Sequence, residues 1–152
     1  MCLMCDGYTQ SQVTAMLNAE IEAHGWSVQY VEDPNPTNCF GYTIGLSAKG
    51  EAEFLVRGMD MDDTCTMLNG LAASVIKKHE HFAKGHTATW RDGRKMYFSQ
   101  MHGASKFALG AYARYGWDTK VLEVHFMDRE IPPETAAMIY KNLALPITRY
   151  TH

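Results

Sequence analysis

Two cysteines near the start of the chain have the spacing of half a zinc site. Cys2 and Cys5 are separated by two residues, which lets both thiolates reach one tetrahedral metal ion. A complete site needs two more ligands, and His24 and Cys39 are the candidates. The alternative is a pair of reduced thiols on a terminus that packs against the domain. We favour that alternative, because the sequence holds no second Cys-x-x-Cys and no His-x3-His.

A second candidate site is the segment 40–46, in which bulky and small side chains alternate. Phe40, Tyr42, Ile44 and Leu46 share one face of the predicted strand, and Gly41, Thr43 and Gly45 share the other. Glycine weakens a strand, so the small face indicates the close approach of a neighbour. We favour a packed helix as that neighbour. If it is instead a flat ligand or a partner chain, the candidate binding residues are Gly41, Thr43, Gly45, Trp26 and Tyr42.

Other reactive side chains have structural explanations. His79 and His81 are two residues apart, so on a helix they do not share a face, and with His86 they predict a polar helix end. Cys65 lies beside an apolar stripe, with nothing nearby that marks it as an activated nucleophile. No motif fixes a reaction, so the sequence leaves open whether the protein is an enzyme.

The elements that must position these residues carry clear local signals. Thr9 and Gln12 have capping-box spacing before a helical run that Gly25 can end. Asp60 can cap a second helix, which we expect to extend to about residue 82. Asp-Gly at 92–93 between alternating runs predicts a tight hairpin with a primed turn.

The predicted order is helix, three strands, helix, hairpin, helix, strand, helix. The ranges are 9–23, 26–32, 40–46, 52–57, 61–82, 87–91 with 94–99, 105–115, 119–126 and 132–143. Short connections between consecutive strands favour an antiparallel meander. We therefore predict one α+β domain over residues 1–152, an antiparallel sheet of meander plus hairpin flanked by helices.

Composition agrees with one globular domain. The chain has 152 residues, of which 46% are hydrophobic and 20% charged, enough to bury a core. The formal net charge of −3 predicts no general affinity for nucleic acid or anionic membranes. The first residues lack the pattern of a signal peptide, so we expect a cytoplasmic protein with reduced cysteines.

The chain resembles the domain of unknown function 4262 family, a group of uncharacterised bacterial and phage proteins. The resemblance covers most of residues 2–128. It rests on segments 2–6, 24–28, 42–46 with 53–58, and 68–72, and more weakly on 124–128, where Asp128 agrees but Phe126 and Met127 do not. The family brings no established activity, and its phage members imply a host-modulating role.

A looser resemblance concerns fold alone. The strand that ends in Thr43-Ile44-Gly45-Leu46, followed by another strand and a capped helix, is similar to the opening of flavin-reductase-type split barrels. Because no motif fixes a reaction, we expect an accessory or regulatory protein that binds a protein partner or small ligand. One alternative is a flavin-binding or other cofactor-binding split-barrel-like enzyme, and another is a small zinc protein. The sequence leaves the oligomeric state open.

Overall fold

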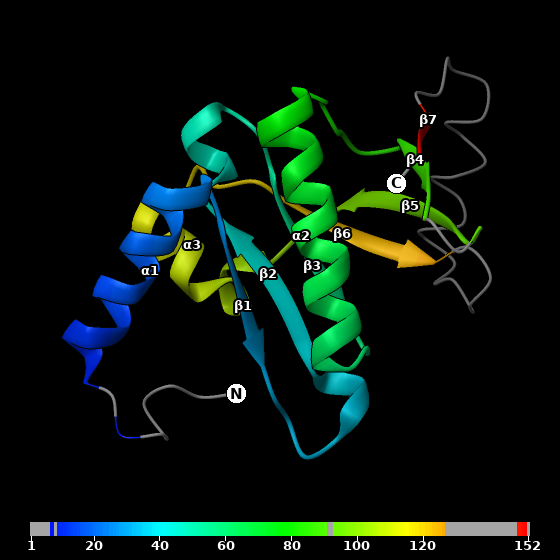
Figure 1. Cartoon of the computed structure of the whole chain (residues 1–152). Coiled ribbons are helices and arrows are strands. Elements are labelled where there is room, and N and C mark those ends of the chain that lie inside the picture. The colour runs from blue at the N-terminus through cyan, green and yellow to red at the C-terminus, as the bar shows by residue number, and fades with distance from the viewer. Residues whose placement is uncertain (1–6, 8, 91–92, 127–148, 152) are drawn as a thin grey trace.

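The computed structural model shows an α+β fold built on one mixed sheet (Figure 1). It describes residue 7 and residues 9–90, 93–126 and 149–151. The helices are α1 (Gln10–His24), α2 (Met61–Lys78) and α3 (Leu109–Tyr115), with short 3-10 helices η1 (Pro36–Asn38), η2 (Leu46–Lys49) and η3 (Ala104–Lys106). The strands are β1 (Ser27–Val31), β2 (Phe40–Ile44), β3 (Glu53–Arg57), β4 (Thr87–Thr89), β5 (Lys95–Gln100), β6 (Val121–Phe126) and β7 (Arg149–Thr151). The helix predicted over 132–143 lies outside the described residues.

The sheet is open and has the order β1-β2-β3-β6-β5-β4-β7. The predicted meander is confirmed, since β1, β2 and β3 pair antiparallel, with Ser27 opposite Ile44 and Phe40 opposite Arg57. The predicted hairpin of β4 and β5 is confirmed as well. What the sequence did not indicate is the join between them: β6 pairs antiparallel with β5 but parallel with β3. That long-range pairing makes the sheet mixed.

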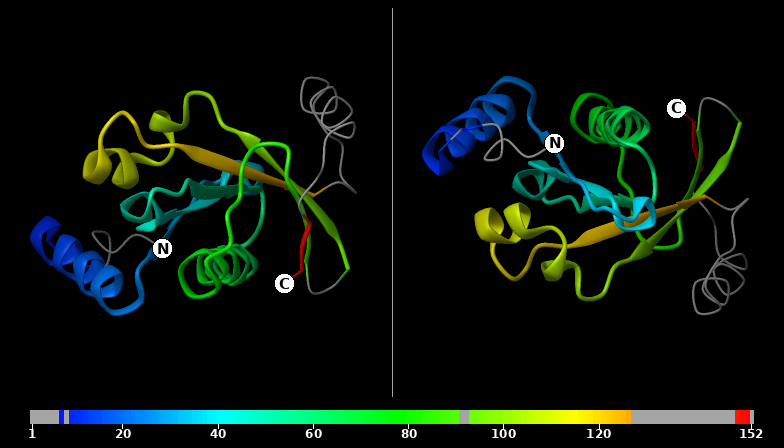
Figure 2. Two further views of the ribbon diagram at one scale, coloured as in Figure 1. Left: turned by 90° about the horizontal axis from the view of Figure 1, so that it is seen from above. Right: turned by 90° about the horizontal axis from the view of Figure 1, so that it is seen from below.

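Helices lie on both sides of the sheet (Figure 2). An apolar cluster of buried side chains lies on each face. Helix α2 lies on one face, where Leu68, Leu71 and Phe98 are fully buried. Helix α3 and η3 lie on the other, over Ile44 and Leu55. Helix α1 flanks the β1 edge, and none of its residues is fully buried. The predicted α+β class is confirmed by this arrangement.

The local signals at the helix ends are mostly confirmed. Thr9 and Gln12 form the capping box, and Gly25 ends α1 in a left-handed conformation at φ +96°. Asp60 accepts a hydrogen bond from the backbone of Asp63 at the start of α2. The predicted end near residue 82 is wrong, because His79 adopts φ +56° and closes the helix after Lys78.

The segment predicted as one helix over 105–115 is divided. It forms η3 and then α3, with Ala108 between them. Gly110 lets α3 approach β2, because a Cβ there would lie 2.9 Å from the Ile44 side chain and 3.0 Å from the Tyr42 hydroxyl.

Candidate functional site

The strongest candidate site is a groove between α1 and α2, over the start of β1. We call it the Trp26 groove. It has a volume of about 470 Å³ and is lined by Glu20, His24, Trp26, Ser27, Val28, Cys65, Asn69 and Lys77. Two residues singled out from the sequence, Trp26 and His24, meet here with three side chains of α2 that sequence reasoning did not connect to them.

The left-handed turn at Gly25 brings Trp26 into the groove. It ends α1 and directs the chain into β1, so that His24 and Trp26 stand on either side of the turn with ring centres 6.3 Å apart. The Trp26 indole is 9% exposed, and its Nε1–H donates to Asn69 Oδ1 at 2.9 Å. The groove therefore has a fixed aromatic floor tied to α2.

The walls of the groove carry opposite charges. The Lys77 ammonium lies 5.8 Å from the centre of the Trp26 ring. On the α1 side, the Glu20 carboxylate accepts a hydrogen bond from Ser27 Oγ, which in turn accepts one from Gln29 Nε2 at 3.1 Å. This chain of hydrogen bonds holds a carboxylate at one wall while an ammonium stands at the other.

Cys65 contributes a neutral thiol to the groove. Burial raises the pKa of this thiol, and the nearby Asp62 carboxylate raises it further. A thiolate is the nucleophilic form of cysteine, so these surroundings do not activate Cys65. Its role in the groove is that of a small, weakly polar contact.

The predicted strand 40–46 is too long, because β2 ends at Ile44 and Leu46 begins η2. Leu46 therefore packs in the core on the α2 face and not with Tyr42 and Ile44.

The small residues of this segment contact other parts of the protein. A Cβ on Gly41 would overlap Thr64 of α2 and lie 3.2 Å from Leu68 Cδ1, which confirms the favoured prediction of a packed helix. A Cβ on Gly45 would overlap the carbonyl oxygen of Gly25 and lie 2.7 Å from Trp26 Cα. At that position the close neighbour is therefore the backbone entering β1 rather than α2.

Tyr42 points to the opposite face of the sheet, away from the Trp26 groove. Its hydroxyl accepts a hydrogen bond from the Gly110 backbone N–H at 3.0 Å. Its side chain is 6% exposed, and burial raises its pKa. The structure therefore does not bring Tyr42 and Trp26 together.

Thr43 belongs to a buried carboxylate site that sequence reasoning missed. Glu53 is fully buried and accepts five hydrogen bonds: from Thr43 Oγ1, the backbone N–H groups of Gly45, Leu46 and Ser47, and Ser47 Oγ. Burial raises the pKa of this carboxyl, against the lowering effect of the hydrogen bonds. The available signal was one acidic residue within the otherwise apolar run 52–56 of this strand.

The predicted metal ligands lie far apart where they can be placed. Cys39 adjoins the Phe40–Val31 end of the β1–β2 pair, whereas His24 precedes the Ser27–Ile44 end. Cys39 is buried, and its Sγ contacts the backbone N and O of Asp33 at 3.3 and 3.4 Å. Cys2 and Cys5 lie outside the described residues. Within the described part of the chain, no group of three His, Cys, Asp or Glu side chains could hold a metal ion.

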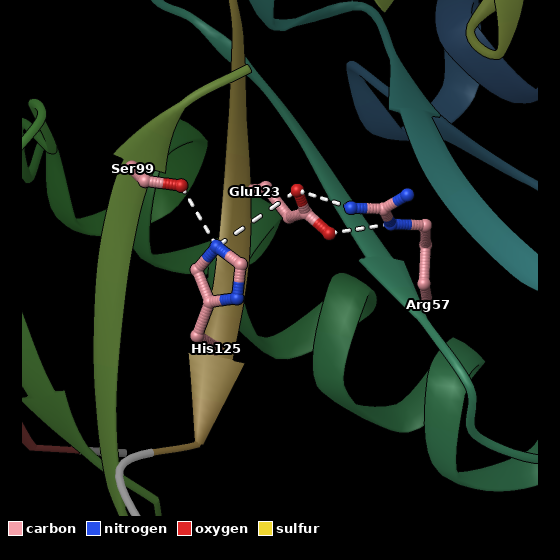
Figure 3. A network of polar contacts seen from close by, with 4 residues as sticks. All are labelled: Arg57, Ser99, Glu123 and His125. Atoms are coloured by element: carbon pink, nitrogen blue, oxygen red, sulfur yellow. Dashed lines mark hydrogen bonds and ion pairs between the residues drawn. The ribbon is translucent and has the colours of Figure 1, made fainter. Parts of the chain in front are cut away.

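A polar cluster on the α3 face of the sheet joins three strands (Figure 3). Arg57 of β3 makes a bidentate ion pair with Glu123 of β6, at 2.5 and 2.9 Å. Ser99 Oγ lies 2.8 Å from His125 Nε2, and a Glu123 oxygen lies 3.8 Å from that same nitrogen. Burial lowers the pKa of His125, against the raising effect of the Glu123 carboxylate.

This cluster differs from a hydrolytic Ser-His-acid relay. In such a relay the serine and the carboxylate contact different ring nitrogens. Here both face Nε2 of His125. Ser99 is also only 7% exposed, so a substrate has little access to its hydroxyl. The geometry is that of a charge-compensated, partly buried cluster that links β3, β6 and β5.

The predicted histidine cluster follows α2 as a loop rather than as part of the helix. His79 is the left-handed cap, and His81 Nδ1 lies 2.7 Å from Glu51 Oε2. The His81 and His86 rings are 6.2 Å apart, edge to face. Burial, and secondarily His81, lowers the pKa of His86.

Comparison with known proteins assigns the chain to a family. Residues 20–130 match the family model described as domain of unknown function (DUF4262). No curated protein matches the chain. No solved structure matches it either. Within the described residues, no helix is long and apolar enough to cross a membrane. The match includes every residue that lines the Trp26 groove. Because it spans most of the chain, this protein belongs to the DUF4262 family.

Proposed function

We propose that this protein is an accessory binding protein that takes a small polar ligand in the Trp26 groove. The observation that carries the proposal is the convergence of α1, β1 and α2 on one groove of about 470 Å³ with an aromatic floor. That volume is within the usual range of about 300–1,000 Å³ for small-molecule sites. The carboxylate of Glu20 and the ammonium of Lys77 favour a ligand that carries both charges, such as a free amino acid.

Chemical-shift mapping tests the proposal directly. The probes are free amino acids, small amines and small carboxylates, each titrated into ¹⁵N-labelled protein. We expect the Trp26 indole N–H and the Cys65 and Asn69 amides to shift with amino acids. In this proposal Lys77 pairs with a ligand carboxylate and Glu20 pairs with a ligand ammonium. Lys77→Met should therefore weaken the binding of carboxylates, and Glu20→Gln should weaken the binding of amines. Both variants should weaken the binding of amino acids.

The matched control for Lys77→Met is Lys78→Met. Both lysines are exposed and adjacent in α2, but only Lys77 lines the groove. Lys78→Met should therefore leave every affinity unchanged. If no probe shifts the groove signals, or if both lysine variants weaken binding equally, the small-ligand proposal fails.

A protein partner is the second candidate, and a separate surface favours it. Trp117 is 85% exposed and Leu109 is 63% exposed, and the Trp117 ring lies 6.3 Å from that of Tyr112. Exposed aromatic side chains are frequent anchors of protein interfaces. A pull-down from lysate with the wild type and with Trp117→Ser tests this: loss of one captured protein with Trp117→Ser supports the partner model, and an unchanged set contradicts it.

The remaining hypotheses have their own tests. The absorbance spectrum of purified protein tests a flavin, and elemental analysis tests zinc at Cys2 and Cys5. We place the protein in the cytoplasm, and the free thiols of Cys39 and Cys65 suit a reducing compartment. Cell fractionation tests that placement.

A further inference from the structure

A second pocket lies where β3 and β6 begin and β5 ends, under the loop that follows α2. We call it the Phe82 pocket. It has a volume of about 290 Å³, and its lining is mostly apolar, from Ala52, Phe82, Val121 and Leu122. It shares no lining residue with the Trp26 groove, so it stands independently of the proposed function.

The outer wall of this pocket is a loop held by hydrogen bonds. Gly85 N–H donates to the Phe98 carbonyl at 2.9 Å, and Phe98 N–H donates to the His86 carbonyl at 3.1 Å. Within the loop, Ala83 N–H donates to His86 Nδ1 at 3.2 Å. The Phe82 ring packs against Phe54 and Phe98, with ring centres 5.3 and 5.1 Å apart. The pocket is therefore formed before any ligand arrives.

Among the described residues, two lysines and no acid line the pocket itself, while Glu51 and Asp118 lie in an adjoining hollow beside Lys120. Lys84 on the loop and Lys120 before β6 both line it, and both are exposed. In the part of the chain that the structure describes, neither lysine has an ion-pair partner, and no carboxylate lines the pocket. Glu51, just outside, contacts His81 Nδ1 at 2.7 Å. Two ammonium groups thus flank an apolar floor.

We infer that the Phe82 pocket binds a small organic anion with an apolar body, such as a short aliphatic or aromatic carboxylate. The apolar lining would take the hydrocarbon part, while Lys84 and Lys120 pair with the charged head. The Gln100 side chain also lines the pocket and offers a neutral polar group. The volume of about 290 Å³ lies at the lower end of the usual range of about 300–1,000 Å³ for small-molecule sites, which suits a small ligand.

Three probes of equal chain length separate charge recognition from apolar contact. Octanoate, octan-1-ol and octylamine are titrated into ¹⁵N-labelled full-length protein below their aggregation concentrations. Octanoate should bind at least tenfold more tightly than octanol, and octylamine more weakly than either. The shifted amides should be those of residues 81–84 and 120–122. Equal binding of octanoate and octanol, or shifts confined to other residues, would overturn the inference.

Paired lysine variants supply the matched control. Lys84→Met/Lys120→Met should weaken octanoate about tenfold or more and leave octanol unchanged. Lys78→Met/Lys106→Met makes the same change of net charge at exposed positions that do not line the pocket, and it should leave both affinities unchanged. If both double variants weaken octanoate equally, the attraction belongs to overall charge and the site is refuted.

The test separates this site from the Trp26 groove. Shifts of the Trp26 indole N–H report the groove, and shifts of the Leu122 amide report the Phe82 pocket. If free amino acids do not bind the Trp26 groove, binding of octanoate in the Phe82 pocket is unaffected. If octanoate does not bind, the result for the Trp26 groove is likewise unaffected.

Discussion

At the scale of single residues, Glu53 is the most constrained side chain. One buried carboxylate satisfies three consecutive backbone N–H groups at 45–47 and thereby shapes the turn between β2 and η2. An unpartnered buried N–H is costly, so this carboxylate stabilises the turn that also positions Gly45 against Trp26.

Glu53→Gln should lower the free energy of unfolding by about 1–3 kcal/mol. Both carboxylate oxygens accept from at least two donors, so an amide NH₂ in either orientation would face N–H or O–H groups. Urea denaturation measures the change. Glu22→Gln on the exposed surface of α1 is the control and should stay within about 0.5 kcal/mol of the wild type. Equal midpoints for the two variants would contradict the role given to Glu53.

The lowered pKa of His125 should make the stability of the fold depend on pH. Burial holds its folded pKa below the ordinary value of 6.5, while the unfolded chain keeps that ordinary value. The stabilisation is therefore fully present above pH 6.5 and is lost as the pH falls toward the folded pKa, by at most about 1.4 kcal/mol per pH unit.

Denaturation of His125→Gln at pH 7.5 and pH 5.5 checks this prediction. The variant should lose less stability between the two values than the wild type does. His102→Gln, at an exposed position, should behave like the wild type. A wild-type curve that is no steeper than that of His125→Gln would rule out the effect.

At the scale of elements, Gly93 and Gly45 both have positive φ, but of the two only Gly45 also has neighbours close to where a Cβ would lie. Substitutions at the two positions therefore distinguish the cost of backbone strain alone from the cost of strain plus crowding. Gly93 lies in the β4–β5 turn at φ +93°, where a Cβ would meet no atom within 4 Å. Its N–H donates to the Trp90 carbonyl, and Trp90 N–H donates to the Arg94 carbonyl. Trp90 and Arg94 therefore close the hairpin, whereas a two-residue primed turn at 92–93 would be closed by residues 91 and 94, so the predicted turn type is wrong. Asp92 lies outside the described residues.

Gly93→Val should cost about 1–2 kcal/mol, because only the left-handed conformation is penalised. Gly45→Val should cost more, since overpacking adds about 1–3 kcal/mol at a place where the Gly25–Trp26 backbone occupies the space. Thermal or urea denaturation of the two variants gives the comparison. Gly45→Val should lose ligand binding only in proportion to folded protein. An equal loss of stability in Gly93→Val and Gly45→Val would show that the Gly25–Trp26 backbone moves at little cost to make room for the added side chain.

At the scale of the whole molecule, the parallel β3–β6 pair joins the meander to the hairpin. The Arg57–Glu123 ion pair crosses that join, with side chains 43% and 10% exposed. Because Arg57 is partly exposed, solvent weakens the pair, yet Glu123 would remain nearly buried if its partner were removed.

Arg57→Met and Glu123→Gln should therefore be coupled. A double-mutant cycle on the free energy of unfolding should give a coupling energy of about 0.5–3 kcal/mol. The control cycle combines Arg57→Met with Glu22→Gln and should be additive within about 0.5 kcal/mol. Additivity in the first cycle would mean that the ion pair contributes nothing to the join.

The sequence by itself determined most of the elements and the family, although it did not indicate β7 or the division of 105–115. Helix caps at Thr9, Gly25 and Asp60, the individual strands of the meander and the hairpin turn are marked by residues within a few positions of one another, so their signals are local. The end of α2 at His79 was missed because a left-handed histidine leaves no such mark in the sequence.

Only the tertiary structure decided which elements meet. The parallel β3–β6 pair, the Glu53 site and the two pockets depend on contacts between residues far apart in the chain, and no local pattern encodes them. Trp26 and His24 were suggested from the sequence, but their convergence with Cys65, Asn69 and Lys77 required the packing of α2 on the sheet. The apolar stripe of α2 is buried over Gly41, where the missing side chain leaves room for the helix. This packing depends on how much apolar area is buried and how well the surfaces fit over the whole domain.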